Sequence, residues 1–139
     1  MAHSVLIDPR FTFNAVDLAD HVQMLDLNVH TDQIEDVAGG DTFAAFMAGI
    51  RRFGATIEGM ADHAVGEVDA TIFAAWAARS AVAIALGADR TAAISTSNPE
   101  YQFTAFVAEY TPLQHRMNEA AKFRLTVAPT TDLVRDVTP

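Results

Sequence analysis

Apolar and polar residues alternate along several stretches of this chain, a period of two that is typical of β-strands with one buried and one exposed face. The clearest stretch is 22–30, which places two sets of side chains on opposite faces: Leu25, Leu27 and Val29 against Met24, Asp26, Asn28 and His30. The same reasoning predicts further strands at 5–7, 11–16, 52–60, 82–86, 101–110 and 121–127. We therefore expect a mainly β (α+β) protein, with antiparallel strands in a β-sandwich or open barrel.

One segment, 69–79, follows a helical period instead. Ile72, Phe73 and Trp76 recur at helical spacing and are expected to anchor the helix on the sheet. Asp69 is expected to cap the N-terminus by accepting hydrogen bonds from the first turn. Arg79 lies in the last turn, where its charge favours the negative end of the helix dipole. The sequence thus predicts one flanking α-helix.

The alternation is lost between residues 31 and 50. This stretch begins with acidic residues, continues through Gly39-Gly40-Asp41 and ends in an apolar segment. Adjacent glycines permit positive φ and fit a sharp reversal of the chain. We expect a long loop excursion from the sheet, with a short helical turn in its second half.

The composition indicates a single folded domain. The chain has 139 residues, of which 50% are hydrophobic and 19% charged, which is too apolar for intrinsic disorder. We expect the domain to occupy residues 1–128 and a polar C-terminal arm to follow at 129–139. The sequence contains no signal peptide pattern, and Arg79 and Ser80 interrupt its longest apolar stretch, so no membrane span is expected.

Charge and cysteine content exclude several classes of function. Eighteen acidic residues against nine basic ones give a formal charge of -9, which disfavours a protein that grips nucleic acid through its phosphates. Residues 1–41 hold eight acids and one Arg, so one surface of the folded chain is expected to carry most of the negative potential. The absence of cysteine excludes disulfides, thiolate nucleophiles and Cys-ligated zinc.

Motifs for catalysis or metal binding are lacking. The five histidines are dispersed, and none has a second histidine two to four residues away. Asp20-His21 and Asp62-His63 are adjacent pairs, whose members point to opposite faces in a strand. The sequence has neither a Gly-x-Ser-x-Gly elbow nor a glycine-rich phosphate loop. We expect no catalytic residue, no cofactor, no metal and no enzymatic activity.

Several short segments, in a shared order, carry a family resemblance. They are Val16-Asp17-Leu18-Ala19-Asp20-His21-Val22, Leu27-Asn28-Val29, Gly40-Asp41-Thr42, Val68-Asp69-Ala70-Thr71-Ile72-Phe73, Ser97-Asn98-Pro99-Glu100-Tyr101 and Ala108-Glu109-Tyr110-Thr111-Pro112. In these segments the chain resembles the major tail tube proteins of long non-contractile tailed bacteriophages, of the siphophage type found in phages of actinobacteria.

The resemblance implies a structural virion protein. Its subunits would close into homo-oligomeric rings, usually hexameric, and the rings would stack into a tail tube. The tube would be a passive conduit for DNA ejection, filled beforehand by a tape measure protein and bounded by tail terminator and distal tail proteins. DNA would pass through the lumen without specific binding. Subunits would be made and assembled in the host bacterial cytoplasm and end in the phage tail.

Two groups of site residues follow from this resemblance. The excursion at 31–50 would reach a neighbouring subunit or ring through Asp41, Phe43, Phe46, Met47 and Ile50, with Arg51 and Arg52 meeting acids of the next protomer. The alternative is that the apolar residues complete the subunit's own core. The polar face formed by Met24, Asp26, Asn28 and His30 would point toward the lumen or toward solvent.

Two other classes of protein stay open at this stage. One is a related ring-forming component, such as a tail terminator or a secretion-system tube. The other is a small α+β ligand-binding protein or enzyme, for which a discrete monomer or dimer with a deep apolar pocket is the expected observation.

Overall fold

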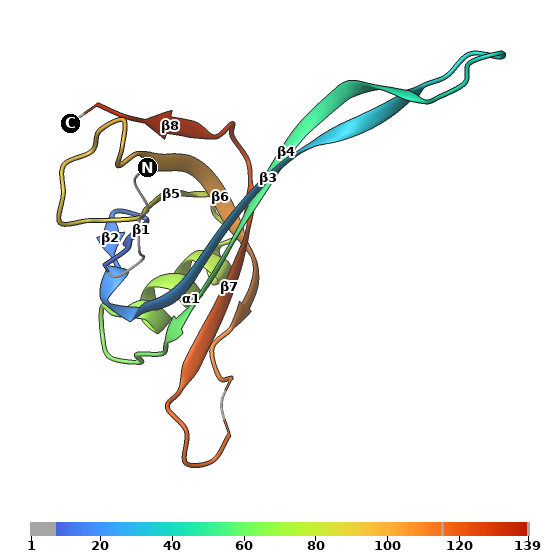
Figure 1. The fold of residues 1–139 in the computed structure, drawn as a ribbon. Helices are drawn as coiled ribbons and strands as arrows, with labels where there is room; N and C mark the ends of the chain where they lie inside the picture. Colours follow the sequence, from blue (N-terminus) through green and yellow to red (C-terminus); the bar gives the residue numbers. More distant parts are fainter. Residues whose placement is uncertain (1–7, 115, 139) are drawn as a thin grey trace.

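The computed structural model describes residues 8–114 and 116–138 (Figure 1). The elements within these residues are β1 Arg10–Phe13, β2 Val16–Asp17, the 3-10 helix η1 Ala19–His21, β3 Val22–Asp36, β4 Ala45–Met60, α1 Val68–Ala78, β5 Val82–Gly87, β6 Glu100–Thr111, β7 Lys122–Pro129 and β8 Val134–Asp136. The strand expected at 5–7 lies outside the described residues. Every other expected strand is present, with 11–16 divided into β1 and β2 by Asn14 and Ala15 at φ 51° and 67°.

The strands form one antiparallel sheet in the order β2-β1-β5-β6-β7-β4-β3, and β8 pairs with β6. The sheet curls around α1, as Figure 1 shows. Its two end strands, β2 and β3, do not pair with each other. The predicted mainly β fold with one flanking helix is confirmed.

The core fills the concave side of this sheet. Four phenylalanines, Phe11, Phe13, Phe103 and Phe123, are at most 5% exposed. Leucine, isoleucine and valine side chains from β4, β5, β6 and β7 surround them. Burial of this apolar surface, at about 25 cal/mol per Å², is the main favourable term for the fold.

The expected loop at 31–50 is a β-hairpin instead. β3 continues to Asp36 and pairs with β4 up to Asp36↔Ala45, so only residues 37–44 form the connection. Gly40 has φ 96° in this connection, as the predicted turn requires, and β4 stands where a helical turn was expected. Apolar and polar residues do not alternate here because neither face of the hairpin is buried against the rest of the chain. An irregularity between Thr31 and Gln33 also shifts the register.

The helix begins and packs differently from the prediction. Glu67 is its N-cap residue, and no side chain caps it, so the capping role expected for Asp69 is wrong. Arg79 is the C-cap, in the left-handed conformation at φ 55°. Ile72 is buried as expected, but Phe73 and Trp76 are each 51% exposed. The buried stripe is Val68, Ile72 and Ala75, which lie four and three residues apart on one face of the helix. Phe73 and Trp76 each follow a buried residue by one position, so they project from the adjoining face.

The C-terminal segment is tied to the sheet. β8 pairs with Glu100–Gln102 of β6, and Thr130 N donates to Thr104 O at 2.8 Å. A three-residue strand with two exposed residues produces no recognisable pattern, so the sequence does not predict it.

Among residues 8–114 and 116–138, no helix has both the length and the apolar character needed to cross a membrane.

Candidate assembly surfaces

The far part of the β3–β4 hairpin, residues 31–51 and here called the distal hairpin, projects from the body of the subunit (Figure 1). It carries the apolar residues expected to contact other subunits: Phe43, Phe46, Met47 and Ile50 are 81%, 60%, 51% and 66% exposed. In this subunit they do not complete its own core, which removes that alternative for them. An isolated two-stranded ribbon with exposed aromatic residues is marginal in water, so this segment is a candidate contact surface.

Three polar residues of the same region, Asp41, Arg51 and Arg52, are paired within the chain. Asp41 Oδ2 accepts a hydrogen bond of 2.7 Å from Ala38 N and closes the turn. Arg52 Nε lies 3.0 Å from Asp32 Oδ2 across the hairpin. Arg51 Nη2 lies 3.2 Å from Asp132 Oδ2, joining the hairpin to the C-terminal segment. Because the pairs of Arg51 and Arg52 are exposed, their exchange for partners on another subunit costs little.

The predicted polar face of β3 lies on the convex side of the sheet. Asp26, Asn28 and His30 are exposed, and Met24 is 40% exposed. The register extends this face over three more strands, through the row Asp26↔Thr56↔Thr126↔Glu109. Only the β3 members were predicted, because the others become neighbours through strand register, which the sequence does not reveal. One side of the sheet is therefore polar across four strands.

The sheet also leaves a long strand edge unpaired. β3 has fifteen residues and pairs only with β4 within the described chain. Its outer backbone N–H and C=O groups are directed away from the sheet. An edge of this kind is a template for pairing with a strand of another chain.

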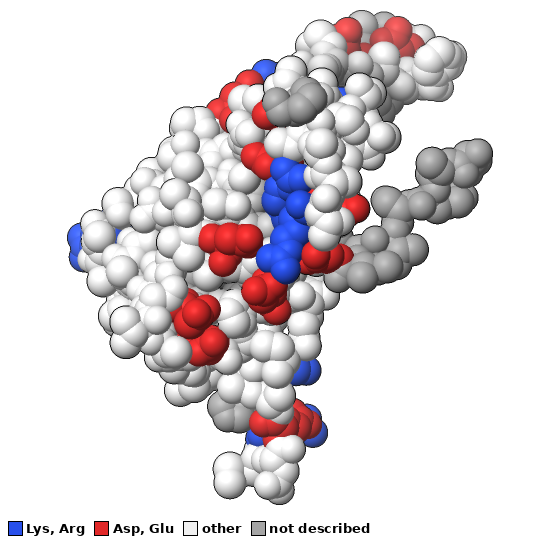
Figure 2. Space-filling model, turned by 90° about the vertical axis from the view of Figure 1, so that its left-hand side faces the viewer, with Lys and Arg blue, Asp and Glu red and all other residues white. Residues whose placement is uncertain are grey.

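The acids of residues 1–41 do not gather on one surface, contrary to the expectation from the sequence. Asp8, Asp17 and Asp20 surround Arg90, whose Nε lies 2.7 Å from Asp8 Oδ1. Hydrogen bonds from Arg90 to Asp8 and then Asp20 raise the pKa of the guanidinium. Glu35, Asp36 and Asp41 lie on the distal hairpin, and Asp26 lies on the polar face. In Figure 2 the acidic clusters are accordingly separate, at the end of the hairpin and over the body of the subunit.

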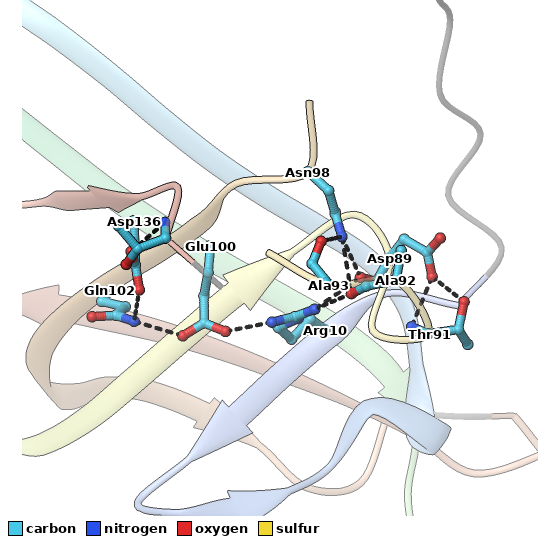
Figure 3. A network of polar contacts seen from close by, with 10 residues as sticks. Arg10, Asp89, Thr91, Ala92, Ala93, Asn98, Glu100, Gln102 and Asp136 are labelled. Atoms are coloured by element: carbon cyan, nitrogen blue, oxygen red, sulfur yellow. Dashed lines mark hydrogen bonds and ion pairs between the residues drawn. The ribbon is translucent and has the colours of Figure 1, made fainter. Parts of the chain in front are cut away.

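A polar network holds the loop between β5 and β6 (Figure 3). Arg10 Nη1 lies 2.8 Å from Glu100 Oε2, and its Nη2 donates to the carbonyl oxygens of Asp89 and Ala92. The side-chain amide of Asn98 donates to three carbonyl oxygens of the same loop. Hydrogen bonds from Thr91 lower the pKa of Asp89. These contacts tie the loop to β1, and they bring no reactive pair together within the described residues.

One group of side chains combines the donor types of a cation site. His21, Asp62 and Glu67 place their ligand atoms within 4.8 Å of one another, the one such group found in the described part of the chain. His21 Nε2 lies 3.1 Å from Glu67 Oε2. The sequence predicted no metal ligands because it treated Asp20-His21 and Asp62-His63 as separate pairs, whereas the fold joins one member of each. The observed contact is a pair between the last residue of η1 and the N-cap of α1.

Sequence comparison gives no family: no protein-family model and no curated protein matches the chain. Comparison with solved structures shows that the chain shares its fold with other proteins. The chain is similar to a chain of the SPP1 tail tube, with a TM-score of 0.71, 8% identity and coverage of 94% of this chain and 77% of that one.

Two further solved structures extend the likeness. One is the tail of an empty gene transfer agent particle refined with C6 symmetry, with a TM-score of 0.61, 11% identity and coverage of 84% and 82%. The other is an extracellular contractile injection system, the PVC sheath–tube complex in its extended state, with a TM-score of 0.71, 12% identity and coverage of 98% and 93%. The chain therefore has the fold seen in phage tail tubes and in related injection assemblies.

Proposed function

We propose that this chain is a structural subunit that assembles into rings stacked as the tail tube of a siphophage, with actinobacterial phages as the source that the sequence resemblance favours. The observation that carries the proposal is the distal hairpin, which projects apolar side chains from a chain with the tail tube fold. An open sheet edge and a projecting hairpin are each liabilities for a monomer and each useful in an assembly.

Ring closure would use the edges of the sheet. Lateral pairing of β3 with an edge of the neighbouring subunit makes the sheet continuous and removes the unpaired backbone groups. The contact is heterologous, because the two edges differ, and heterologous contacts generate closed rings when the rotation closes. We assign six subunits to the ring, by analogy with the C6 symmetry of the gene transfer agent tail.

The polar face would line the lumen. Its row of Asp26, Thr56, Thr126 and Glu109 offers carboxylates and hydroxyls to a passing duplex. The arginines of the same face, Arg52 and Arg124, are paired with Asp32 and Glu58. Such a wall repels phosphates, which lets DNA pass without adhering. A tape measure protein would fill the lumen before ejection, and tail terminator and distal tail proteins would bind the ends. Assembly would take place in the host bacterial cytoplasm.

The test is direct imaging of the purified chain. Size-exclusion chromatography and negative-stain electron microscopy over a concentration series should show rings at low concentration and tubes at high concentration. A chain that stays a monomer or a closed dimer at every concentration would overturn the proposal.

Matched variants separate the contribution of the hairpin residues to tube formation from the general effect of substituting an exposed residue. Phe46→Ala and Asp41→Ala should reduce tube formation. Met117→Ala, at a side chain 90% exposed on the loop between β6 and β7, should not. Intact tubes in both hairpin variants would show that the hairpin assignment is wrong, even if the chain forms tubes.

A further inference from the structure

The outer face of α1 is apolar, although it lies at the surface. The helix has eleven residues, of which Asp69 alone is charged. Its exposed members are Ala70, Phe73, Ala74, Trp76, Ala77 and Ala78. The rings of Phe73 and Trp76 lie 5.4 Å apart and are half exposed. A helix that is apolar on every side is normally buried, so this face requires a cover in the working assembly.

A groove beside this face indicates which side chains the surface that covers α1 must contain. It has a volume of about 740 Å³ and is lined by Ala75, Trp76, Ala77, Arg79, Phe106 and Val107. Phe106 is 43% exposed. Arg79 is exposed and takes part in none of the ion pairs of the described residues. The groove therefore fits an apolar side chain accompanied by a carboxylate.

The distal hairpin presents that combination. Phe46 and Glu35 are direct cross-strand partners, so an exposed aromatic ring and a carboxylate lie side by side on one face. The ion pairs of the hairpin region use Asp32 and Asp132, and they leave Glu35 available. The hairpin points away from α1 of its own subunit (Figure 1), so the complementary groove belongs to another copy.

We propose that the α1 groove of one subunit receives the distal hairpin of a second copy, with Phe46 against Trp76 and Phe106 and with Glu35 paired to Arg79. The inference rests on the proposed tube function and names the contact that holds successive subunits. Because the hairpin and the groove are different surfaces, each bound copy still offers one of each, and the contact propagates instead of closing as a dimer.

The chain carries its own reporter for this contact, because Trp76 is its single tryptophan. On assembly of the unmodified chain, the fluorescence emission should shift to shorter wavelength and acrylamide quenching should fall, as Trp76 becomes covered. Electron microscopy of the same samples records whether tubes are present. Tubes whose Trp76 is quenched as strongly as in the free subunit would overturn the inference and leave the tube function standing.

The identity of the cover is tested by disulfide cross-linking, which is specific here because the chain has no native cysteine. Phe46→Cys combined with Ala77→Cys should give a ladder of covalent oligomers under oxidation. Phe46→Cys combined with Val65→Cys, a fully exposed residue in the connection between β4 and α1, should give none. Tubes without the first ladder would show that some other surface or protein covers α1, against the inference.

If the cysteine variants fail to assemble, exchanging the charges of Glu35 and Arg79 tests the same contact. Glu35→Arg and Arg79→Glu should each weaken assembly, and the double variant should restore it. Failure of the double variant, while each single variant remains folded by circular dichroism, would count against the pairing. If the unmodified chain forms no rings or tubes at any concentration, the proposed function falls and this inference falls with it.

Discussion

The hydroxyl group of Tyr110 in β6 donates a hydrogen bond of 2.8 Å to Oδ1 of Asp69 in the first turn of α1. This contact holds the beginning of the helix against the sheet, in place of the capping bond that the sequence suggested for Asp69. Burial, and then the hydrogen bond to Asp69, raise the pKa of the Tyr110 phenol above its ordinary value of 10.0. A hydrogen bond to a charged acceptor typically stabilises a fold by about 1.5–3 kcal/mol.

Tyr110→Phe should therefore lower the free energy of unfolding by about 1.5–3 kcal/mol at pH 8. The contribution of Tyr110 is complete below pH 10, the ordinary pKa of the unfolded phenol, and is lost above it because the unfolded state then releases a proton that the folded state keeps. Urea unfolding at pH 8 and pH 11 measures both effects. Parallel pH curves for the unmodified chain and Tyr110→Phe would contradict the assignment.

Two glycines of β4 should respond in opposite ways to alanine. A Cβ at Gly59 would overlap the backbone carbonyl group of His21, the last residue of η1, and a backbone group cannot swing aside as a flexible side chain can. We expect Gly59→Ala to destabilise the fold by roughly 3 kcal/mol or more, as overpacking against backbone does.

Gly54→Ala is the matched control in the same strand, because a Cβ there meets nothing within 4 Å. Its effect should range from neutral to a gain of about 0.5–1 kcal/mol, since alanine has less backbone entropy to lose than glycine. Thermal unfolding of both variants gives the comparison. Equal midpoints would mean that the backbone of His21 does not approach Gly59 as described.

Substitution of Arg10 and of Arg51 tests how much each of their ion pairs contributes to the stability of the fold. Arg10 and Glu100 form a pair whose side chains are 17% and 14% exposed, and Arg10 also donates to two loop carbonyl groups. Arg10→Met should cost about 2–3 kcal/mol, because Glu100 loses its cationic partner in a half-buried site.

Arg51→Met removes a pair whose side chains are 78% and 72% exposed, and it should change stability by less than about 0.5 kcal/mol. Urea unfolding at matched ionic strength measures both. A loss for Arg51→Met as large as that for Arg10→Met would show that the hairpin is tied to the C-terminal segment more firmly than its exposure indicates.

The sequence predicts the strands in which burial of one face makes apolar and polar residues alternate. It does not predict the strands that have no buried face. Strands β3 to β7 were predicted because alternate residues such as Phe123 and Leu125 must face inward. The distal hairpin has no buried face, so its strands have no period to reveal them. Trp76 was predicted as an anchor from its size, but the space available inside a curled sheet depends on tertiary packing.

The candidate surfaces were predictable to a similar extent. The apolar residues from Phe43 to Ile50 and the polar face of β3 were identified from the sequence, because each is local. The remainder of the polar face and the α1 groove were not. They arise from strand register and from the approach of Phe106 to the helix, which are contacts between residues far apart in the chain.

The helix provides a further pair of variants. Ile72 is fully buried, and Ile72→Ala should cost about 2–5 kcal/mol by the usual cost of truncation in a core. Trp76 is 51% exposed, so Trp76→Ala should cost less than Ile72→Ala in the isolated subunit while it impairs assembly more. Unfolding of the subunit and imaging of tubes separate the two effects. A larger loss of subunit stability for Trp76→Ala would restore the anchoring role expected from the sequence.

The polar face yields a prediction about DNA. Asp26 is exposed at one end of the row that continues to Glu109. Asp26→Asn should leave ring and tube formation unchanged and slow DNA delivery, because a lumen wall with less negative charge repels phosphates less. Removing Glu109 as well, by Glu109→Gln, should enlarge the effect.

Phage carrying these substitutions are compared by infectivity and by the rate of DNA ejection, with Glu119→Gln on the loop between β6 and β7 as control. The difference from the unmodified phage should diminish at high salt, where the repulsion between the wall and the phosphates is screened in both. Normal ejection from Asp26→Asn and from the double variant would remove this face from the lumen and place it on the outer wall.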